Sequence, residues 1–255
     1  MCLIVLAIDS RPDLPLILAA NRDEFYRRPT AAAEFWDDDP QILAGRDLQA
    51  GGTWLGVTRA GRWAAVTNVR NPQDMKPGRR SRGRLVRDFL RGTLAPGCFL
   101  RKLAPEAASF PGFNLLLGSA AQAWYFSNRN SCAPRRLEEG IYGLSNARLD
   151  TPWPKVRGAR ADLEALLAAQ RPPAAVDLFA LLADERRPAD HELPDTGVGL
   201  DWERTLGSRF IRSADYGTRC STLLRLDRDG FLDFRERSFN AGRVVMEHGF
   251  SWHLS

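Results

Sequence analysis

Two short apolar runs near the start of the chain constrain its fold more than any other feature. Residues 2–8 and 15–21 consist mainly of Ile, Leu, Val and Ala, and the segment 9–13 between them has the sequence Asp-Ser-Arg-Pro-Asp. Short apolar runs on either side of a turn-forming segment are typical of a β-hairpin whose strands are buried. The sequence therefore predicts an N-terminal hairpin of two buried strands.

The open end of this hairpin carries reactive side chains. Cys2 begins the first strand, and the second strand leads into an Asn-Arg-Asp-Glu sequence at residues 21–24. Antiparallel pairing brings Arg22 and Asp23 back toward Cys2. If Met1 is removed, Cys2 carries a thiol and also a free α-amine, whose ordinary pKa is about 7.7–8.0. One residue would then supply both a nucleophile and a base.

Simpler roles are open for the same residues. Cysteine is often a plain core residue, which would suffice for Cys2 at the start of a buried strand. Arg22 and Asp23 would equally suit a structural ion pair. Asparagines near strand ends, such as Asn68 and Asn146, often satisfy only the backbone of a turn. The residues alone leave the catalytic and the structural interpretations open.

The remaining patterns predict further strands with helices between them. Strand patterns occur at 51–57, 62–68, 113–118, 123–127, 140–146, 216–226, 231–239 and 244–246. Helical spacing follows residue 85 and recurs at 151–170 and 174–183. We expect an irregular connection over 27–40 and a mobile loop over 184–199, which would cover a site. Because no linker or repeat divides the chain, we expect one domain over residues 1–255.

Composition excludes several classes of protein. The chain is 44% hydrophobic and 26% charged, as in ordinary globular proteins, and no run approaches the ~18 apolar residues of a membrane span. The cysteines at 2, 98, 132 and 220 lack metal-ligand spacing, and without a secretory leader they indicate a reducing compartment. Basic residues are not clustered with aromatic ones, which disfavours nucleic-acid binding. We therefore expect a cytoplasmic protein without a metal or cofactor.

The positive charge of the chain is almost entirely arginine. Lysine occurs only at positions 76, 102 and 155, so 33 of the 36 cationic residues are arginine. Arginine suits bidentate contacts with carboxylates and phosphates, although a genome rich in G and C produces the same bias. The basic segment 76–84 leads into a predicted helix with Ser81 as its N-cap, and it would serve either as an anion site or as a solvated loop.

With these motifs in order, the chain resembles the NRDE family, also called the transport and Golgi organization protein 2 family. The resemblance rests on blocks at residues 1–4, 20–25, 51–56, 68–70, 81–83, 113–115, 144–146, 153–156 and 216–219. The layout is also similar to that of N-terminal-nucleophile hydrolases of the choloylglycine hydrolase and penicillin V acylase type. That similarity implies an α+β fold, a four-layer αββα sandwich with two antiparallel sheets.

The resemblance also implies residue roles. The implied catalytic residues are Cys2 as nucleophile with its α-amine as base, Arg22 and Asp23 holding the amine, Asn68 as oxyanion donor, Asn146 orienting amine or substrate, and Arg219 closing the charged ring. The residues expected to bind substrate are Asn21, Trp54, Arg70, Arg82 and Arg209. Arg209 and Arg219 compete for the last catalytic role.

Two functions follow as expectations from this resemblance. The first is a thiol hydrolase or acyltransferase acting on an amide, ester or thioester bond of a small amphipathic or lipid-like substrate. Here a guanidinium would favour the thiolate form of Cys2 and the neutral form of its amine. The second is a non-catalytic carrier of an amphipathic anion, because family members are linked to haem mobilisation and to acyl-CoA or lipid handling.

Overall fold

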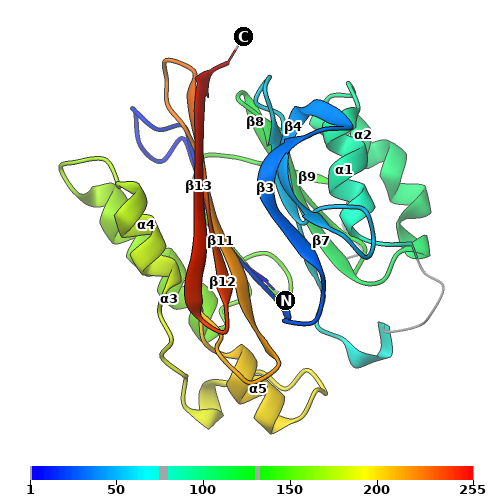
Figure 1. Cartoon of the computed structure of the whole chain (residues 1–255), viewed down its shortest axis with the longest axis vertical. Helices are drawn as coiled ribbons and strands as arrows, with labels where there is room; N and C mark the ends of the chain where they lie inside the picture. Colours follow the sequence, from blue (N-terminus) through cyan, green and yellow to red (C-terminus); the bar gives the residue numbers. More distant parts are fainter. Residues whose placement is uncertain (1, 75–79, 130–132, 255) are drawn as a thin grey trace.

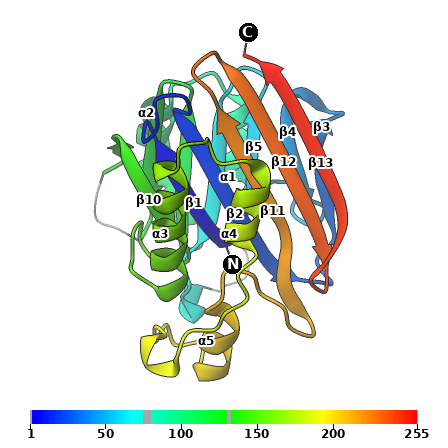
Figure 2. The same ribbon diagram turned by 90° about the vertical axis from the view of Figure 1, so that its left-hand side faces the viewer.

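Two antiparallel sheets packed face to face form the centre of the molecule, and helices cover both outer faces (Figures 1 and 2). The computed structural model describes residues 2–74, 80–129 and 133–254. Helices α3 (Pro154–Ala168) and α4 (Ala175–Leu182) pack on the first sheet, and α1 (Gly83–Arg91) and α2 (Pro96–Leu103) pack on the second. The predicted αββα sandwich is confirmed.

The first sheet has six strands in the order β10-β1-β2-β11-β12-β13, and the second has seven in the order β3 to β9. The strands of the first sheet are β1 (Cys2–Ile8), β2 (Leu16–Phe25), β10 (Gly140–Leu144), β11 (Tyr216–Leu226), β12 (Phe231–Asn240) and β13 (Arg243–His253). Those of the second are β3 (Thr30–Trp36), β4 (Asp39–Asp47), β5 (Leu55–Thr58), β6 (Trp63–Asn68), β7 (Phe113–Ser119), β8 (Gln122–Ser127) and β9 (Arg135–Leu137). Shorter helical segments are η1 (Pro72–Asp74), η2 (Ala104–Ser109), η3 (Asp190–Glu192) and α5 (Leu200–Leu206).

Strand β1 is buried on both faces, as its apolar run predicts. Leu3 and Val5 pack against α3 and α4, whereas Ile4 and Leu6 pack between the two sheets. Burying each such side chain stabilises the fold by about 1.5–3 kcal/mol. Because side chains alternate along a strand, Cys2 points to the same side as Ile4, toward the space between the sheets.

The predicted irregular connection over 27–40 is wrong. Strands β3 and β4 occupy most of it, because an alanine-rich run with weak strand propensity is held by its neighbours. Glu236 on β12 accepts a hydrogen bond from the Ala33 backbone N–H at 2.8 Å, and this bond joins β3 to the first sheet. The strand exists because of pairing and burial rather than because of a local pattern.

Two further expectations concern loops. Helix α1 begins at Gly83 with Arg82 as its N-cap and without a side-chain cap, so the prediction of Ser81 as N-cap is wrong. The start of α1 instead packs on the backbone of the second sheet, where the Gly83 carbonyl accepts from the Thr53 N–H at 3.2 Å. Most of the basic loop, residues 75–79, and Cys132 lie outside the described residues. In the part of the chain that the structure covers, no helix has the length and apolar character of a membrane span.

Candidate active site

Cys2 and Arg22 face each other across the first hairpin, at the end of the molecule where α5 lies (Figures 1 and 2). Side chains of directly opposed residues in antiparallel strands lie on the same face of the sheet. The Arg22 side chain is buried, its guanidinium lies 4.2 Å from the centre of the Trp54 ring, and it donates to Thr30 Oγ1 at 3.3 Å. The fold therefore holds a cation beside the thiol.

A narrow pocket between the two sheets lies beside Cys2. Its volume is about 10 Å³, roughly the space that one water molecule needs. Arg22 and Trp54 form part of its wall, and the far edge of the Trp54 ring packs over Gly45, where any Cβ atom would clash with it. The pocket as it stands is too small for a larger substrate, which would need its walls, Arg22 and Trp54 among them, to move apart.

Burial dominates the electrostatics of the thiol. It raises the pKa of Cys2 above its ordinary value, the Asp23 carboxylate adds to the rise, and the Arg22 guanidinium opposes it. Burial also raises the pKa of Asp23, whose Oδ1 accepts a hydrogen bond from Thr218 Oγ1 at 2.8 Å. A thiol with a raised pKa is protonated at neutral pH, so nucleophilic attack requires a nearby base.

Asn68 and Asn146 form an amide pair close to the Cys2 strand. Asn146 Nδ2 donates to the backbone oxygen of Asn68 at 3.0 Å and to its Oδ1 at 2.8 Å. Because Oδ1 of Asn68 is the acceptor, the Nδ2 end of that amide points away from Asn146. Ser145 Oγ donates to the Cys2 carbonyl at 2.8 Å, so residues 145–146 connect β1 to the end of β6.

A buried group of charges adjoins this pair. Arg70 and Glu203 form an ion pair inside the protein, and the Arg70 backbone N–H donates to the Asn146 carbonyl at 2.7 Å. The Arg70 guanidinium lies 4.6 Å from the centre of the Trp153 ring, just before α3. Lys155, in the first turn of α3, is also buried, and burial lowers its pKa to about 8 while Asp23 opposes the shift.

Arg209 and Arg219, which sequence reasoning could not separate, lie in different places. Arg209 Nη1 donates to Asp162 on α3 at 2.6 Å and to the Leu181 carbonyl on α4 at 3.2 Å, so its guanidinium binds to the two outer helices. Its predicted contact with substrate stays a prediction. Arg219 donates to the carbonyls of residues 25, 26 and 28, and burial followed by Arg22 lowers its pKa. Only Arg219 lies on the Arg22 side.

The other two predicted contacts are used within the protein. Asn21 Nδ2 donates to the carbonyls of Leu182 and Arg209 at 2.9 Å each, so this side chain links β2 to the segment that follows α4. Arg82 Nη1 donates at 3.1 Å to the Gly112 carbonyl, which also accepts the N–H of Val69, next to Asn68. Arg82, which lies just before α1, therefore supports the backbone next to the end of β6.

Comparison with known proteins identifies the family. A family model described as "Transport and Golgi organisation 2" matches residues 1–241. The chain belongs to the Transport and Golgi organisation 2 family. Curated members include the human homologue, 39% identical over 93% of both chains, and the bovine homologue, 38% identical over 93% of both chains. The Drosophila melanogaster protein is 27% identical over 93% of this chain and 92% of its own.

Solved structures show the fold of this family member. A C2A mutant of the conjugated bile acid hydrolase from Clostridium perfringens has a TM-score of 0.52 and covers 100% of this chain and 98% of its own, at 6% identity. A Caenorhabditis elegans orthologue of N-acylethanolamine-hydrolyzing acid amidase covers 88% of this chain and 92% of its own, with a TM-score of 0.47 and 10% identity. The TM-score above 0.5 for the bile acid hydrolase shows that this chain shares its sandwich fold.

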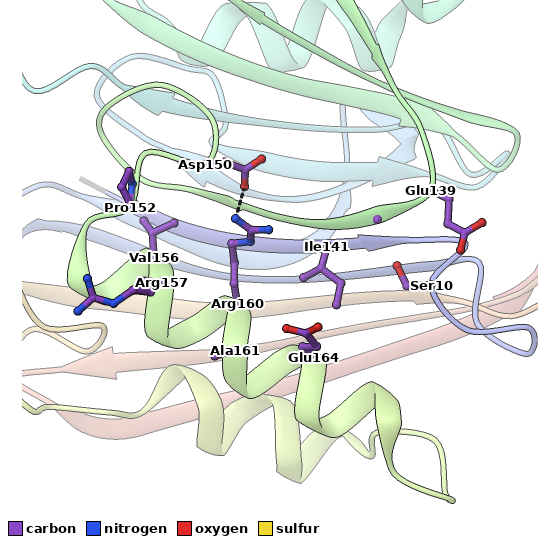
Figure 3. A pocket seen from close by; sticks show the side chains of 11 residues that line it. Ser10, Glu139, Ile141, Asp150, Pro152, Val156, Arg157, Arg160, Ala161 and Glu164 are labelled. Carbon is purple, nitrogen blue, oxygen red and sulfur yellow. Dashed lines mark ion pairs between the residues drawn. The ribbon is translucent and has the colours of Figure 1, made fainter.

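The protein has a second, larger cavity, which lies away from Cys2. It has a volume of about 540 Å³ and lies between α3 and β10, toward the far end of β1 (Figure 3). Its lining is rich in charge, including Glu139, Arg157 and Glu164, and Arg160 contacts Asp150 at 3.3 Å. Cys2 and Arg22 do not line this cavity, so of the two it is the smaller pocket that the Cys2 thiol borders.

Sequence reasoning missed Lys155, Glu203 and Thr218 as members of the Cys2 environment. One signal for Lys155 was present, because it is one of only three lysines in a chain that otherwise uses arginine. Glu203 and Thr218 had no such signal, since each becomes relevant only when α5 and β11 are placed beside β2. With these residues, the surroundings of the Cys2 thiol are a buried network of charged and polar groups rather than one cation.

Proposed function

We propose that this protein is an N-terminal-nucleophile cysteine hydrolase or acyltransferase that acts on an amide, ester or thioester bond of a small amphipathic substrate. In this proposal, Met1 is removed, the Cys2 thiol attacks the carbonyl carbon, and the Cys2 α-amine accepts the thiol proton. The observation that carries the proposal is the pairing of Cys2 with the buried Arg22 at the pocket between the sheets. Of the other described thiols, Cys98 is exposed, and Cys220, which also pairs with Arg22, does not line this pocket.

The residues around Cys2 fit the separate steps of this chemistry. The Arg22 guanidinium stabilises the thiolate, and the Asp23 carboxylate accepts a hydrogen bond from the amine and so fixes its lone pair. Attack gives a tetrahedral oxyanion, to which Asn68 Nδ2 donates. The α-ammonium then returns its proton to the leaving group, which leaves an acyl-cysteine. A water molecule, deprotonated by the amine, releases the acid and restores the thiol.

Asn146 and Arg219 have supporting roles in the proposal. Asn146 holds the Asn68 amide in one orientation through its two hydrogen bonds, so the oxyanion donor is positioned before substrate binds. Arg219 braces the turn after β2 and lies close to Arg22. The structural neighbour with a TM-score of 0.52 supports the general class, because it is a hydrolase studied with its own Cys2 replaced by alanine.

The test begins with the intact mass of the purified protein, which should show loss of one methionine. Incubation with p-nitrophenyl butyrate should then produce a butyryl adduct that peptide mass spectrometry places on Cys2. Cys2→Ala should remove the adduct, whereas Cys98→Ala, at an exposed thiol, should leave it unchanged. Undiminished acylation of the Cys2→Ala variant, or a retained Met1, would contradict the proposal.

One observation favours a second candidate, a carrier of haem or acyl-CoA without turnover. Burial keeps the Cys2 thiol in the protonated form, which attacks carbonyls poorly. A carrier would bind haem or oleoyl-CoA in a fixed ratio whether position 2 is Cys or Ala, and it would form no acyl adduct. Equilibrium binding to both variants, measured beside the acylation assay, separates the two functions.

A further inference from the structure

The lysine at the start of α3 is buried in a way that folding does not explain. Lys155 is 4% exposed, and its Nζ has no hydrogen-bond partner among residues 2–74, 80–129 and 133–254. An ammonium group buried without such partners is costly. Its place in the first turn of a 15-residue helix adds to that cost, because the helix dipole disfavours cations there.

Arg70 has the same surplus of donors. Its guanidinium is buried and reaches Glu203 through Nη1, but Nε and Nη2 have no partner in the described part of the chain. Nε and Nη2 form one edge of the planar guanidinium, the edge whose two parallel N–H groups bind a carboxylate bidentately. The arginine therefore keeps its carboxylate-binding edge unused.

These two cations lie together, beside the nucleophile. Burial first, and then the neighbouring charge of Arg70, lower the pKa of Lys155, while the groups of Asp23 and Cys2 oppose the shift. The backbone agrees, since Trp153, two residues before Lys155, packs against the Arg70 guanidinium. The unused donors of the two side chains therefore share one buried region next to Cys2.

The nearby carboxylate of Glu203 does not use up these donors. Its Oε2 is bound by Arg70 Nη1, and its Oε1 accepts both the backbone N–H and the hydroxyl of Thr196, at 2.9 and 2.5 Å. Glu203 is thus fixed in place and holds one end of the guanidinium. The Asp23 carboxylate, whose charge acts most strongly on Lys155, is not hydrogen-bonded to its Nζ either. The other edge of Arg70 and the ammonium of Lys155 therefore keep donors for a further acceptor.

We propose that Lys155 and Arg70 form a subsite for a carboxylate group of the ligand whose reacting carbon lies at Cys2. The substrate class is then an acyl compound that carries a carboxylate close to the bond that is cleaved. The assignment of a substrate rests on the proposed function, but the subsite itself requires only that a ligand binds beside the thiol. Arg70 supplies the bidentate contact, and Lys155 supplies charge and a third donor.

Alkylation of Cys2 tests this subsite without turnover. Iodoacetate and iodoacetamide carry the same reacting carbon and leaving group, but only iodoacetate carries a carboxylate. Rates at Cys2, followed by peptide mass spectrometry at neutral pH, should favour iodoacetate in the native protein. Lys155→Met should lower the iodoacetate rate about tenfold more than the iodoacetamide rate, the effect of losing one hydrogen bond to a charged group.

Two controls make the result specific. Lys102→Met, at an exposed lysine on α2, removes the same charge far from the site and should change neither rate. Lys155→Arg keeps the charge and should retain the preference for iodoacetate. Equal losses with both reagents in Lys155→Met would show that Lys155 acts only through the charges of Asp23 and Cys2, and would overturn the subsite.

Protection of the unaltered protein gives a second measurement that no folding defect can obscure. Butyrate should slow the alkylation of Cys2 by iodoacetate, and butyramide, its neutral analogue, should not. Equal effects of the two compounds would overturn the subsite. A protein that prefers iodoacetate but forms no acyl adduct with p-nitrophenyl butyrate would contradict the proposed enzyme while keeping the carboxylate subsite.

Discussion

Cys2 and Cys220 lie on either side of Arg22 in neighbouring strands, yet their surroundings differ. Both residues pair with Arg22 in the sheet, and burial raises the pKa of both thiols. Beside Cys220, both carboxylate oxygens of Glu236 accept hydrogen bonds from within the protein. Beside Cys2, a pocket reaches the sulfur and nearby cations keep donors without partners.

The comparison separates buried polar groups that are hydrogen-bonded within the fold from buried polar groups that keep donors without a partner. At the Cys220 end, Glu236 links β12 to β3, so hydrogen bonding within the fold accounts for its burial. At the Cys2 end, Lys155 and Arg70 have hydrogen-bonding capacity that the fold leaves unused. Single buried donors without a partner also occur elsewhere, at Arg62 and Trp63 for example, so it is two such cations together beside Cys2 that mark the candidate site.

The largest expected difference is in the reactivity of the two thiols. In native protein at neutral pH, iodoacetamide should modify Cys2 at least about 10³-fold faster than Cys220, because Cys220 is 3% exposed and becomes reactive only when the structure opens. Peptide mass spectrometry measures both rates in one sample. Unfolding in urea should make the rates similar. Similar rates in the native protein would contradict the expected difference between the two thiols.

Removing the proposed oxyanion donor should be the next largest effect. Asn68→Ala should lower the rate of Cys2 acylation by p-nitrophenyl butyrate about 10²–10³-fold, the usual cost of losing one such donor. Alkylation by iodoacetamide should be unaffected, because that reaction forms no oxyanion. Glu236→Gln, on the Cys220 side, serves as the matched control and should leave acylation unchanged. Equal losses in both variants would point to a general structural defect.

The third prediction concerns stability and pH. The pKa of Lys155 in the fold is about 8, against an ordinary value of 10.5, so the unfolded chain binds more protons between these pH values. The unfolding free energy should therefore rise with pH across this window, by about 3 kcal/mol relative to Lys155→Met. Urea denaturation at a series of pH values measures the difference. A Lys155→Met variant that is less stable than the native protein at neutral pH would contradict it.

The smallest effect is expected at the Cys220 end. Burial raises the pKa of Glu236, while hydrogen bonds from Ala33 and Thr222 oppose that rise and limit its size. A carboxyl group with a raised pKa in the fold loses stability as pH rises above its ordinary value of 4.5. Glu236→Gln should make the unfolding free energy flatter above that pH. Thermal denaturation of both proteins at acid and neutral pH checks the sign.

The hairpin and its reactive end could be predicted because they depend on local patterns. A buried run, a turn and a second buried run determine that Cys2 and Arg22 face each other, as the register confirms. Strand β3 could not be predicted in this way, because its alanines favour a strand only beside β4 and Glu236. Its formation depends on contacts that the local sequence does not encode.

The same limit applies within the site. The side of the sheet that Arg219 faces depends on an irregularity between Thr218 and Cys220, where the pairing of β11 with β2 shifts, and Arg209 lies outside this strand. Counting alternate residues through such a bulge gives the wrong face. Lys155 was missed because its burial depends on β2 and on the segments around Arg70 and Glu203, which are distant in sequence.

Gly45 determines where the Trp54 ring lies, and this ring forms part of the wall of the pocket beside Cys2. The indole of Trp54 lies flush on β4 only because residue 45 has no side chain. A methyl group there would clash with the ring and displace it from its present place beside Arg22. In the proposed enzyme, residue 45 on β4 of the opposite sheet therefore sets the shape of the pocket wall without being one of the groups assigned to the chemistry.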